Sequence, residues 1–258
     1  MKSKKVYIIL IAILLVFCIT MFLMFGLDEL RKGGYNATIV VDKDTLWTFS
    51  DKQWGNVTSH DEYNWKKYNV YLNRVKQGNY YLWYNDKWYA FDDNKEAVVL
   101  DGGSFLAINS NYDIPVYDFE INDIDDYSYV NEELKKNKLP IDNYYTVSKK
   151  IVFDYDNDGE DEYFYIISNV FPTDFNPEKV FSMVFMVKGD KTYSIYKGID
   201  TNTGFNGCRP YFNGFLDVDN DSKYEFILSC DKYSVSGSTR MLFDFENNKF
   251  KILISNNK

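Results

Sequence analysis

Residues 154–162 are the stretch whose residue types point most directly to chemistry. Its nine residues include six acidic side chains and no basic one, and it lies between two apolar segments. Carboxylates at alternate positions place oxygen atoms on one side of a tightening loop, and Gly159 lets the backbone turn. The predicted cation ligands are the side chains of Asp154, Asp156, Asp158 and Glu162 and the backbone carbonyl group of Glu160. Without a cation, these carboxylates would repel one another.

The same pattern returns at residues 217–225, with carboxylates again at the first, third, fifth and ninth positions. The ligands predicted there are the side chains of Asp217, Asp219, Asp221 and Glu225 and the backbone carbonyl group of Lys223. No cysteine or histidine accompanies either loop, and ligation by oxygen alone favours calcium over zinc. An EF-hand would need glutamate at its twelfth position, where the chain has Tyr165 and Leu228. We therefore expect two structural calcium sites, and the alternative is a pair of solvated acidic turns.

Apolar and aromatic strands must hold both loops in place. A strand is predicted on each side of the first loop, a hairpin follows, and the second loop has the same surroundings. The predicted strands cover residues 151–153, 163–167, 180–187 and 192–196 in the first unit, and 211–216, 224–228, 241–245 and 250–254 in the second. The two loops begin 63 residues apart, which indicates a repeat of one four-stranded antiparallel sheet, at about 147–200 and 208–258.

The acidic residues of the two loops, each set between hydrophobic strands, resemble the calcium loops of FG-GAP or VCBS repeats, as in integrin-like β-propellers. That resemblance implies a loop between the first two strands of each blade and a propeller-like arrangement of the sheets. It also implies a role in adhesion, recognition or scaffolding outside the cell. The fold class that we expect is therefore all-β, with repeated antiparallel four-stranded sheets.

Aromatic residues make up 19% of the chain, and such side chains favour pleated, half-buried strands. All five tryptophans precede residue 110, and they are Trp47, Trp54, Trp65, Trp83 and Trp88. Residues 79–84 and 87–91 predict a hairpin, which short strands at 96–100 and 104–108 continue as a meander. Core packing is the first expectation for these aromatic side chains. Exposed members would instead bind a cell-wall glycan or a protein partner.

Residues 118–126 again offer oxygen-bearing side chains at the first, third, fifth and ninth positions, but the third is the longer Glu120. We expect an acidic surface turn there, with a third cation loop as the alternative. The following segment, 131–136, begins with Asn131 and two acids and ends with lysines before Pro140. That order predicts a short helix.

The N-terminal segment predicts a transmembrane helix. Three lysines precede residues 6–25, an apolar run in which Thr20 is the one distinctly polar member. About 20 residues span a hydrocarbon core of about 30 Å, whereas the apolar part of a cleaved signal peptide has about 7 to 15. The lysines favour residues 1–5 in the cytoplasm, so that a linker at 26–36 and a β-rich domain at 37–258 lie outside the cell membrane. A cleaved signal peptide is the alternative.

Cysteine pairing stays open at this point. One cysteine falls in the predicted span, and an extracytoplasmic setting permits the other two, Cys208 and Cys230, to pair. A simple hairpin with Leu216 opposite Phe226 places Cys230 opposite Phe212, about 13 Å along the strand from Cys208. Two buried free thiols are therefore the first expectation, and a disulfide is the alternative.

Charge and motif content exclude several function classes. With 29 basic and 38 acidic residues the net charge is −9, which argues against nucleic-acid binding. The only histidine is His60, and its sequence neighbours Ser59 and Asp61 do not thereby face it as a triad requires. The sequence holds no phosphate-binding glycine loop, zinc motif or nucleophile elbow. We expect a membrane-anchored, extracytoplasmic binding or scaffold protein, and the alternative is a surface hydrolase that uses paired carboxylates.

Overall fold

The computed structural model describes residues 35–100, 103–141, 145–170, 180–200, 208–232 and 237–257. In these ranges the chain forms three antiparallel sheets and one α-helix, so the all-β prediction is confirmed. Within the described residues, none of the three sheets closes on itself. The predicted membrane segment, residues 6–25, lies outside the described ranges, and no helix inside them is long and apolar enough to cross a bilayer.

The N-terminal sheet has eight strands in the order β3-β2-β1-β8-β4-β5-β6-β7. They are β1 (Ala37–Val41), β2 (Thr45–Ser50), β3 (Gln53–Asn56), β4 (Lys66–Leu72), β5 (Val75–Asn85), β6 (Lys87–Phe91), β7 (Ala97–Val98) and β8 (Phe105–Ser110). The aromatic hairpin is confirmed as β5 and β6, with Asn85 paired to Lys87. The meander is confirmed as far as β7, which pairs with β6, but its last strand is wrong, because β8 crosses back to lie between β1 and β4. Residues 105–108 are all buried, and a strand buried on both faces suits the middle of a sheet.

The other two sheets contain the repeat. The first repeat sheet has the order β10-β11-β12-β13-β14, and the second repeat sheet has the order β18-β17-β16-β15-β9. Their strands are β9 (Val116–Tyr117), β10 (Ile121–Asp123), β11 (Val147–Phe153), β12 (Glu162–Ser168), β13 (Val180–Lys188), β14 (Lys191–Asp200), β15 (Cys208–Leu216), β16 (Glu225–Lys232), β17 (Ser238–Glu246) and β18 (Lys249–Asn257). Each sheet has five strands instead of the predicted four, because β9 and β10 add to the edges at β15 and β11. These two strands are too short to show an alternating pattern in the sequence.

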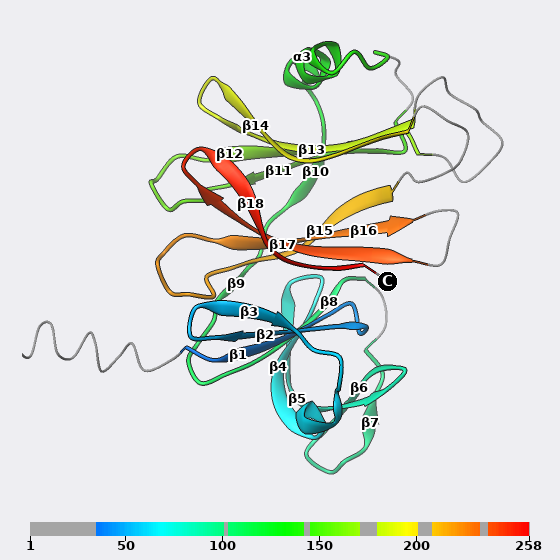
Figure 1. Cartoon of the computed structure of the whole chain (residues 1–258), viewed down its shortest axis with the longest axis vertical. Coiled ribbons are helices and arrows are strands. Elements are labelled where there is room, and N and C mark those ends of the chain that lie inside the picture. The colour runs from blue at the N-terminus through cyan, green and yellow to red at the C-terminus, as the bar shows by residue number, and fades with distance from the viewer. Residues whose placement is uncertain are drawn as a thin grey trace, which may run out of the picture.

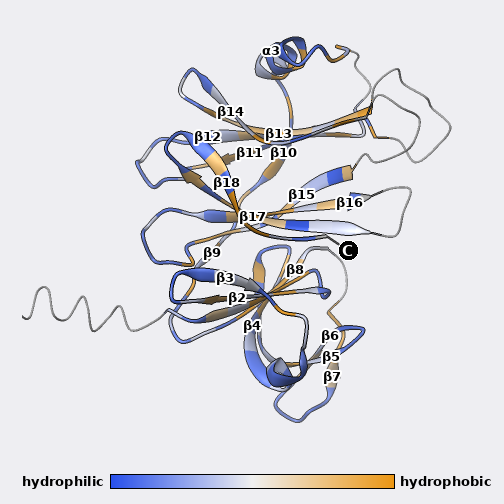
Figure 2. Ribbon diagram, viewed as in Figure 1, coloured by the Kyte–Doolittle hydropathy of each residue, from blue (hydrophilic) through white to orange (hydrophobic). Residues whose placement is uncertain are grey.

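The sheets stack as layers, with the second repeat sheet between the other two (Figure 1). An aromatic core that includes Phe164 and Phe226 fills the space between the two repeat sheets. A second core, with Trp47 and Leu242, joins the N-terminal sheet to the second repeat sheet. Figure 2 shows hydrophobic residues along the strands and hydrophilic residues in the connections. The second repeat sheet therefore buries apolar side chains on both of its faces.

The single described α-helix, α3 (Ser128–Lys136), packs on the first repeat sheet through Val130 and Leu134. It begins three residues before the predicted start, where the Asp126 carboxylate accepts hydrogen bonds from the backbone N–H and hydroxyl groups of Ser128. Among the described residues, the carboxylate groups close enough to share a cation do not include any from 118–126. The acids of that segment instead form ion pairs, namely Asp118 with Arg74, Asp123 with Lys149 and Asp125 with Lys150.

Cys208 and Cys230 form a disulfide with Cα atoms 5.3 Å apart, so the expectation of two free thiols is wrong. In the hairpin of β15 and β16, Leu216 pairs with Glu225 instead of the expected Phe226, which moves the register by one residue. A bulge at Asn213 moves the register by one more residue. Cys230 therefore pairs with Pro210, only two residues from Cys208.

A buried polar cluster joins the N-terminal sheet to the second repeat sheet. Asp42, in the turn after β1, forms an ion pair with Arg240 of β17 at 2.7 Å, and neither side chain is more than 10% exposed. The same carboxylate accepts hydrogen bonds from Tyr211, Asn213 and Ser229. Burial raises the pKa of Asp42, and the charge of Arg240 opposes that shift. The cluster thus joins the two sheets, and its ion pair stabilises the contact only while both Asp42 and Arg240 are present.

We expect Arg240→Ala to destabilise the protein by about 3 to 5 kcal/mol, because it leaves the buried Asp42 carboxylate without its counter-charge. Urea unfolding of the full-length chain, followed by circular dichroism, measures this loss. The matched control is Arg209→Ala, since Arg209 is exposed on β15 of the same sheet, and it should change stability by less than about 0.5 kcal/mol. Equal effects of the two substitutions would contradict a specific role for the ion pair.

Candidate functional site

The two acidic loops occupy equivalent places in the repeat sheets. The first connects β11 with β12 and the second connects β15 with β16, and both lie on the same side of the stacked sheets (Figure 1). The ninth residue of each loop, Glu162 or Glu225, is also the first residue of the following strand. Strand pairing therefore fixes the position of that glutamate in both units.

The two loops also share one set of internal hydrogen bonds. In each, the carboxylate of the first residue accepts from the backbone N–H groups of the fifth and sixth residues. The carboxylate of the fifth accepts from the N–H of the seventh, and that of the ninth accepts from the N–H of the second. The sixth residue has a positive φ in both loops, 90° at Gly159 and 70° at Ser222. The two backbones are thus closely matched, although only one loop has the glycine that favours this conformation.

Three carboxylates of each loop offer oxygen atoms within 4.8 Å of one another. They belong to Asp154, Asp156 and Glu162 in the first loop and to Asp217, Asp219 and Asp221 in the second. The remaining predicted side-chain ligands, Asp158 and Glu225, each hold a backbone N–H group with one oxygen. Glu160 and Lys223, predicted to contribute through their carbonyl groups, have exposed side chains. The structure therefore gathers most of the carboxylates that the spacing singled out.

A lysine lies at the centre of the first loop. The ammonium group of Lys188, at the end of β13, donates to four carboxylate oxygens of Asp156, Asp158 and Glu162 at 2.7 to 2.8 Å. Burial lowers the pKa of Lys188, but these hydrogen bonds outweigh it and hold the pKa above its usual value. The same contact lowers the pKa of Asp158. The first loop thus already holds a cation, and it is part of the chain itself.

The second loop has a carboxylate where the first has this lysine. By strand pairing, the place that Lys188 takes beside Glu162 is taken beside Glu225 by Asp244 of β17. Among the described residues, no lysine or arginine forms an ion pair with this loop. Burial, followed by neighbouring carboxylates, raises the pKa of Glu225 to about 9 and that of Asp219 to about 6. The donors of the second loop therefore fit a divalent cation that would offset their charge.

Lys188 and Asp244 are the residues of these sites that the sequence patterns did not single out. Each lies on the third strand of its unit, opposite the final glutamate of the loop. Pairing the predicted strand 163–167 with 180–187, and 224–228 with 241–245, is the step that would have placed Lys188 and Asp244 near those glutamates.

Five aromatic side chains lie together on the N-terminal sheet, and this surface is here called the aromatic face. Trp65 and Tyr89 are exposed, and Tyr81, Trp83 and Phe91 are half-buried. Tyr81 pairs with Phe91 and Trp83 with Tyr89, so these four share one side of the β5–β6 hairpin. Trp65 is 45% exposed and Tyr89 is 39% exposed. Core packing is confirmed for Trp47 and Trp88, which are buried, but not for this surface.

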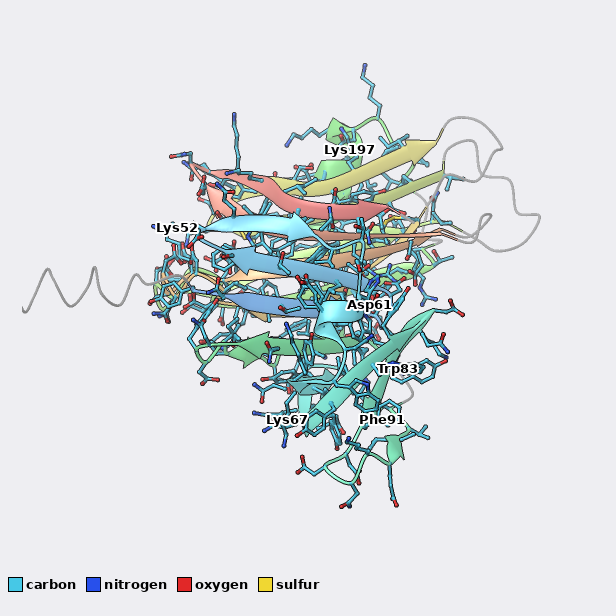
Figure 3. The ribbon with its side chains drawn as sticks, turned by 60° about the horizontal axis from the view of Figure 1, so that its bottom comes forward. Lys52, Asp61, Lys67, Trp83, Phe91 and Lys197 are labelled. Atoms are coloured by element: carbon cyan, nitrogen blue, oxygen red, sulfur yellow. A yellow bond between two sulfur atoms is a disulfide. The ribbon has the colours of Figure 1, made fainter. Side chains whose placement is uncertain are left out.

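Lysines border the aromatic face. The ammonium groups of Lys67, Lys87 and Lys95 lie 5.3, 5.4 and 5.9 Å from the ring centroids of Tyr81, Tyr89 and Trp65. Figure 3 shows Lys67, Trp83 and Phe91 at the end of the molecule opposite α3. The face thus combines exposed rings with hydrogen-bond donors at its edge.

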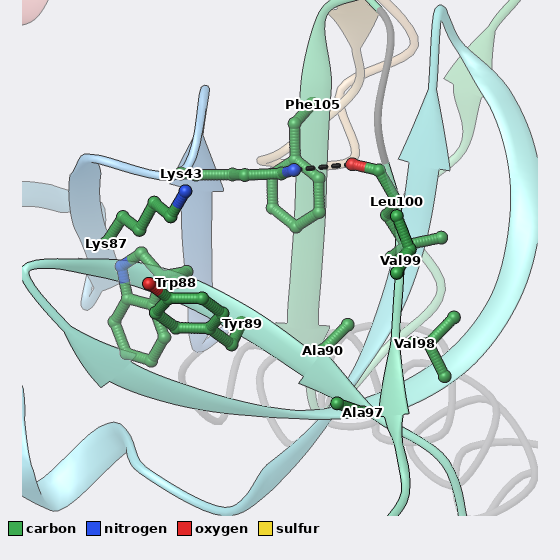
Figure 4. Close-up of a pocket in the computed structure, with 10 residues that line it drawn as sticks. All are labelled: Lys43, Lys87, Trp88, Tyr89, Ala90, Ala97, Val98, Val99, Leu100 and Phe105. Atoms are coloured by element: carbon green, nitrogen blue, oxygen red, sulfur yellow. Dashed lines mark hydrogen bonds between the residues drawn. The ribbon is translucent and has the colours of Figure 1, made fainter.

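A cavity of about 220 Å³ opens next to the aromatic face, between β6, β7 and the start of β8 (Figure 4). Its lining is mostly apolar, with Trp88, Val98 and Phe105, and the charged groups in it are Lys43 and Lys87. The ammonium group of Lys43 donates to the backbone carbonyl of Leu100. The cavity could therefore accept a small apolar substituent of a ligand held on the adjoining surface.

Outside the acidic loops, two carboxylates also come together in a hollow of the described structure. Asp118 and Glu120 line a shallow hollow, but both are exposed and Asp118 pairs with Arg74 at 3.4 Å. A general acid needs burial to keep its proton at neutral pH. His60 stacks on Tyr84 with ring centroids 3.8 Å apart, an arrangement of packing.

Comparison of the chain with protein-family models, with curated proteins and with solved structures finds no match. What the chain does must therefore be inferred from its own acidic loops and aromatic face.

We expect calcium to raise the melting temperature of the full-length chain and a chelator to lower it. Calcium at ten times its dissociation constant stabilises a folded protein by about 1.4 kcal/mol, which corresponds to roughly 3 to 6 °C for a domain of this size. Differential scanning calorimetry measures the shift, and sodium chloride of equal ionic strength controls for screening. An identical melting temperature in all three conditions would exclude a structural cation in either loop.

Proposed function

We propose that the chain is a membrane-anchored, extracytoplasmic binding module that holds a cell-wall glycan on its aromatic face and carries structural calcium in its acidic loops. The observation that supports this function best is the aromatic face itself, with five aromatic side chains gathered on one surface. Contiguous exposed apolar surface on a soluble domain marks a binding site. The repeat sheets act as the scaffold that presents this surface away from α3.

A glycan suits this surface better than a flat protein partner does. Sugar rings present C–H groups that pack on aromatic rings, and their hydroxyl groups accept hydrogen bonds from donors at the edge of the stack. The aromatic face offers both, since Lys67, Lys87 and Lys95 border its rings. Tyr89 also lines the adjoining cavity, which gives a ring substituent a place to enter.

Structural calcium and a propeller-like arrangement of the sheets belong to the same proposal. Two loops with one hydrogen-bond pattern, each between neighbouring strands, support the likeness to FG-GAP or VCBS repeats. A cation at a loop would join the ends of two strands, so its role is to stabilise the sheet rather than to catalyse.

The membrane part of the proposal rests on the apolar run at residues 6–25, with residues 1–5 in the cytoplasm. The disulfide between Cys208 and Cys230 supports an extracytoplasmic domain, because such bonds persist in oxidising compartments.

Protease added to intact cells should therefore degrade the β-rich domain and leave a short membrane-bound fragment. An antibody tag at the C-terminus reports the loss on a blot, and a cytoplasmic protein serves as the control for cell integrity. Full protection of the tag in cells, with cleavage after lysis, would overturn the outward orientation.

Replacing Trp83 by alanine should weaken glycan binding about tenfold, because loss of one stacked ring removes roughly 1.4 kcal/mol. The probes are soluble oligomers of N-acetylglucosamine and insoluble cell-wall material, and the readouts are tryptophan fluorescence and co-sedimentation. Tyr163→Ala is the matched control, since Tyr163 is 40% exposed on the first repeat sheet, far from the aromatic face in the fold. That variant should bind as the unmodified chain does.

Failure of the unmodified chain to bind any of these glycans would overturn the glycan proposal. Equal weakening by Trp83→Ala and Tyr163→Ala would move the binding site away from the aromatic face. Capture of a protein by the unmodified chain but not by Trp83→Ala would replace the glycan with a protein partner.

A further inference from the structure

The two acidic loops have the same backbone hydrogen bonds, but the side chain that faces them from the third strand has the opposite charge. Their hydrogen bonds correspond position by position, with donor–acceptor distances of 2.7 to 3.1 Å. The difference lies in one side chain contributed by the third strand of each unit, which is Lys188 in the first and Asp244 in the second.

In the first loop, the lysine takes the place where a metal ion would bind. Its nitrogen lies within 2.8 Å of four carboxylate oxygens, a spacing close to that of calcium and its ligands. Because the ammonium group is attached to the chain, its effective concentration at the loop is high and independent of the solution. A calcium ion would have to displace the ammonium group of Lys188, which would then lie next to the double positive charge of the ion.

In the second loop, the corresponding position adds a negative charge. The register of β16 and β17 places Asp244 beside Glu225, and no described lysine or arginine forms an ion pair with either of them or with the three clustered aspartates. Ionised carboxylates at this loop repel one another, and a bound cation would offset their charge. The first loop demonstrates that this backbone can hold a cation among its oxygens.

We propose that residues 154–162 use Lys188 as a built-in cation and bind no metal ion, so that the structural calcium of the proposed function belongs to residues 217–225, where Asp244 takes the corresponding place. This division between the loops rests on the structural calcium of the proposed function and names the loop that takes it. A single substitution at either position should change the number of ions that the chain holds.

Isothermal titration of the detergent-solubilised full-length chain with calcium counts these ions. We expect one ion for the unmodified chain, two for Lys188→Ala and none for Asp244→Lys. Lys191→Ala is the matched control, because Lys191 pairs with Lys188 across the β13–β14 turn but makes no contact with the loop carboxylates in the described structure, and it should keep one ion. Asp219→Asn should abolish binding, whereas Asp156→Asn should retain it.

Two ions on the unmodified chain would overturn the division while leaving structural calcium intact. Loss of the ion in Asp156→Asn but not in Asp219→Asn would also overturn it. No ion on the unmodified chain would overturn structural calcium and the division together, and glycan co-sedimentation would still test the aromatic face. If Lys188→Ala folds only when calcium is added, the division is supported, and failure to fold in calcium would overturn it.

Discussion

Both repeat units depend on a buried glutamate that ends the acidic loop and begins the next strand. Glu162 and Glu225 each hold the backbone N–H group of the second loop residue with one oxygen. A carboxylate removed from water must meet a positive charge or keep its proton. Burial raises the pKa of both glutamates, but Lys188 opposes that shift at Glu162 from 2.7 Å, whereas neighbouring carboxylates add to it at Glu225, whose pKa rises to about 9. The same loop conformation therefore occurs with two different arrangements of charge around the glutamate.

The second repeat sheet connects this constraint to the rest of the molecule. Its acidic loop touches the segments that flank the N-terminal sheet, because the Tyr112 hydroxyl donates to the Val218 carbonyl and Asn220 donates to Tyr35. Its strands hold the buried carboxylate of Asp42 from the N-terminal sheet. The surface proposed to bind a glycan is therefore connected, through packed sheets and a polar cluster, to the loop proposed to bind calcium. Stability at that loop supports the sheet that carries the aromatic face.

Features set by neighbouring residues could be predicted from the sequence. Alternation and aromatic content identified the β5–β6 hairpin and the four main strands of each repeat unit. Features that depend on pairing between strands far apart in the chain could not be predicted. The place of β8 between β1 and β4 depends on partners far along the chain, and β9 and β10 show no pattern of their own. A hairpin register one residue from the expected one, together with the bulged residue Asn213, brought Cys230 within reach of Cys208.

In the candidate site, too, the features set by neighbouring residues could be predicted and those set by distant pairing could not. The spacing of the acids identified the loop residues, because the loop gathers them by its own turn and internal hydrogen bonds. The neutralising group was missed, because Lys188 reaches Glu162 only through strand pairing, from 26 residues away. Two loops with the same spacing can therefore differ in whether they need a cation from solution. The residue opposite the final glutamate is as much a part of this site as the acids themselves, because it brings a positive charge to the first loop and a negative charge to the second.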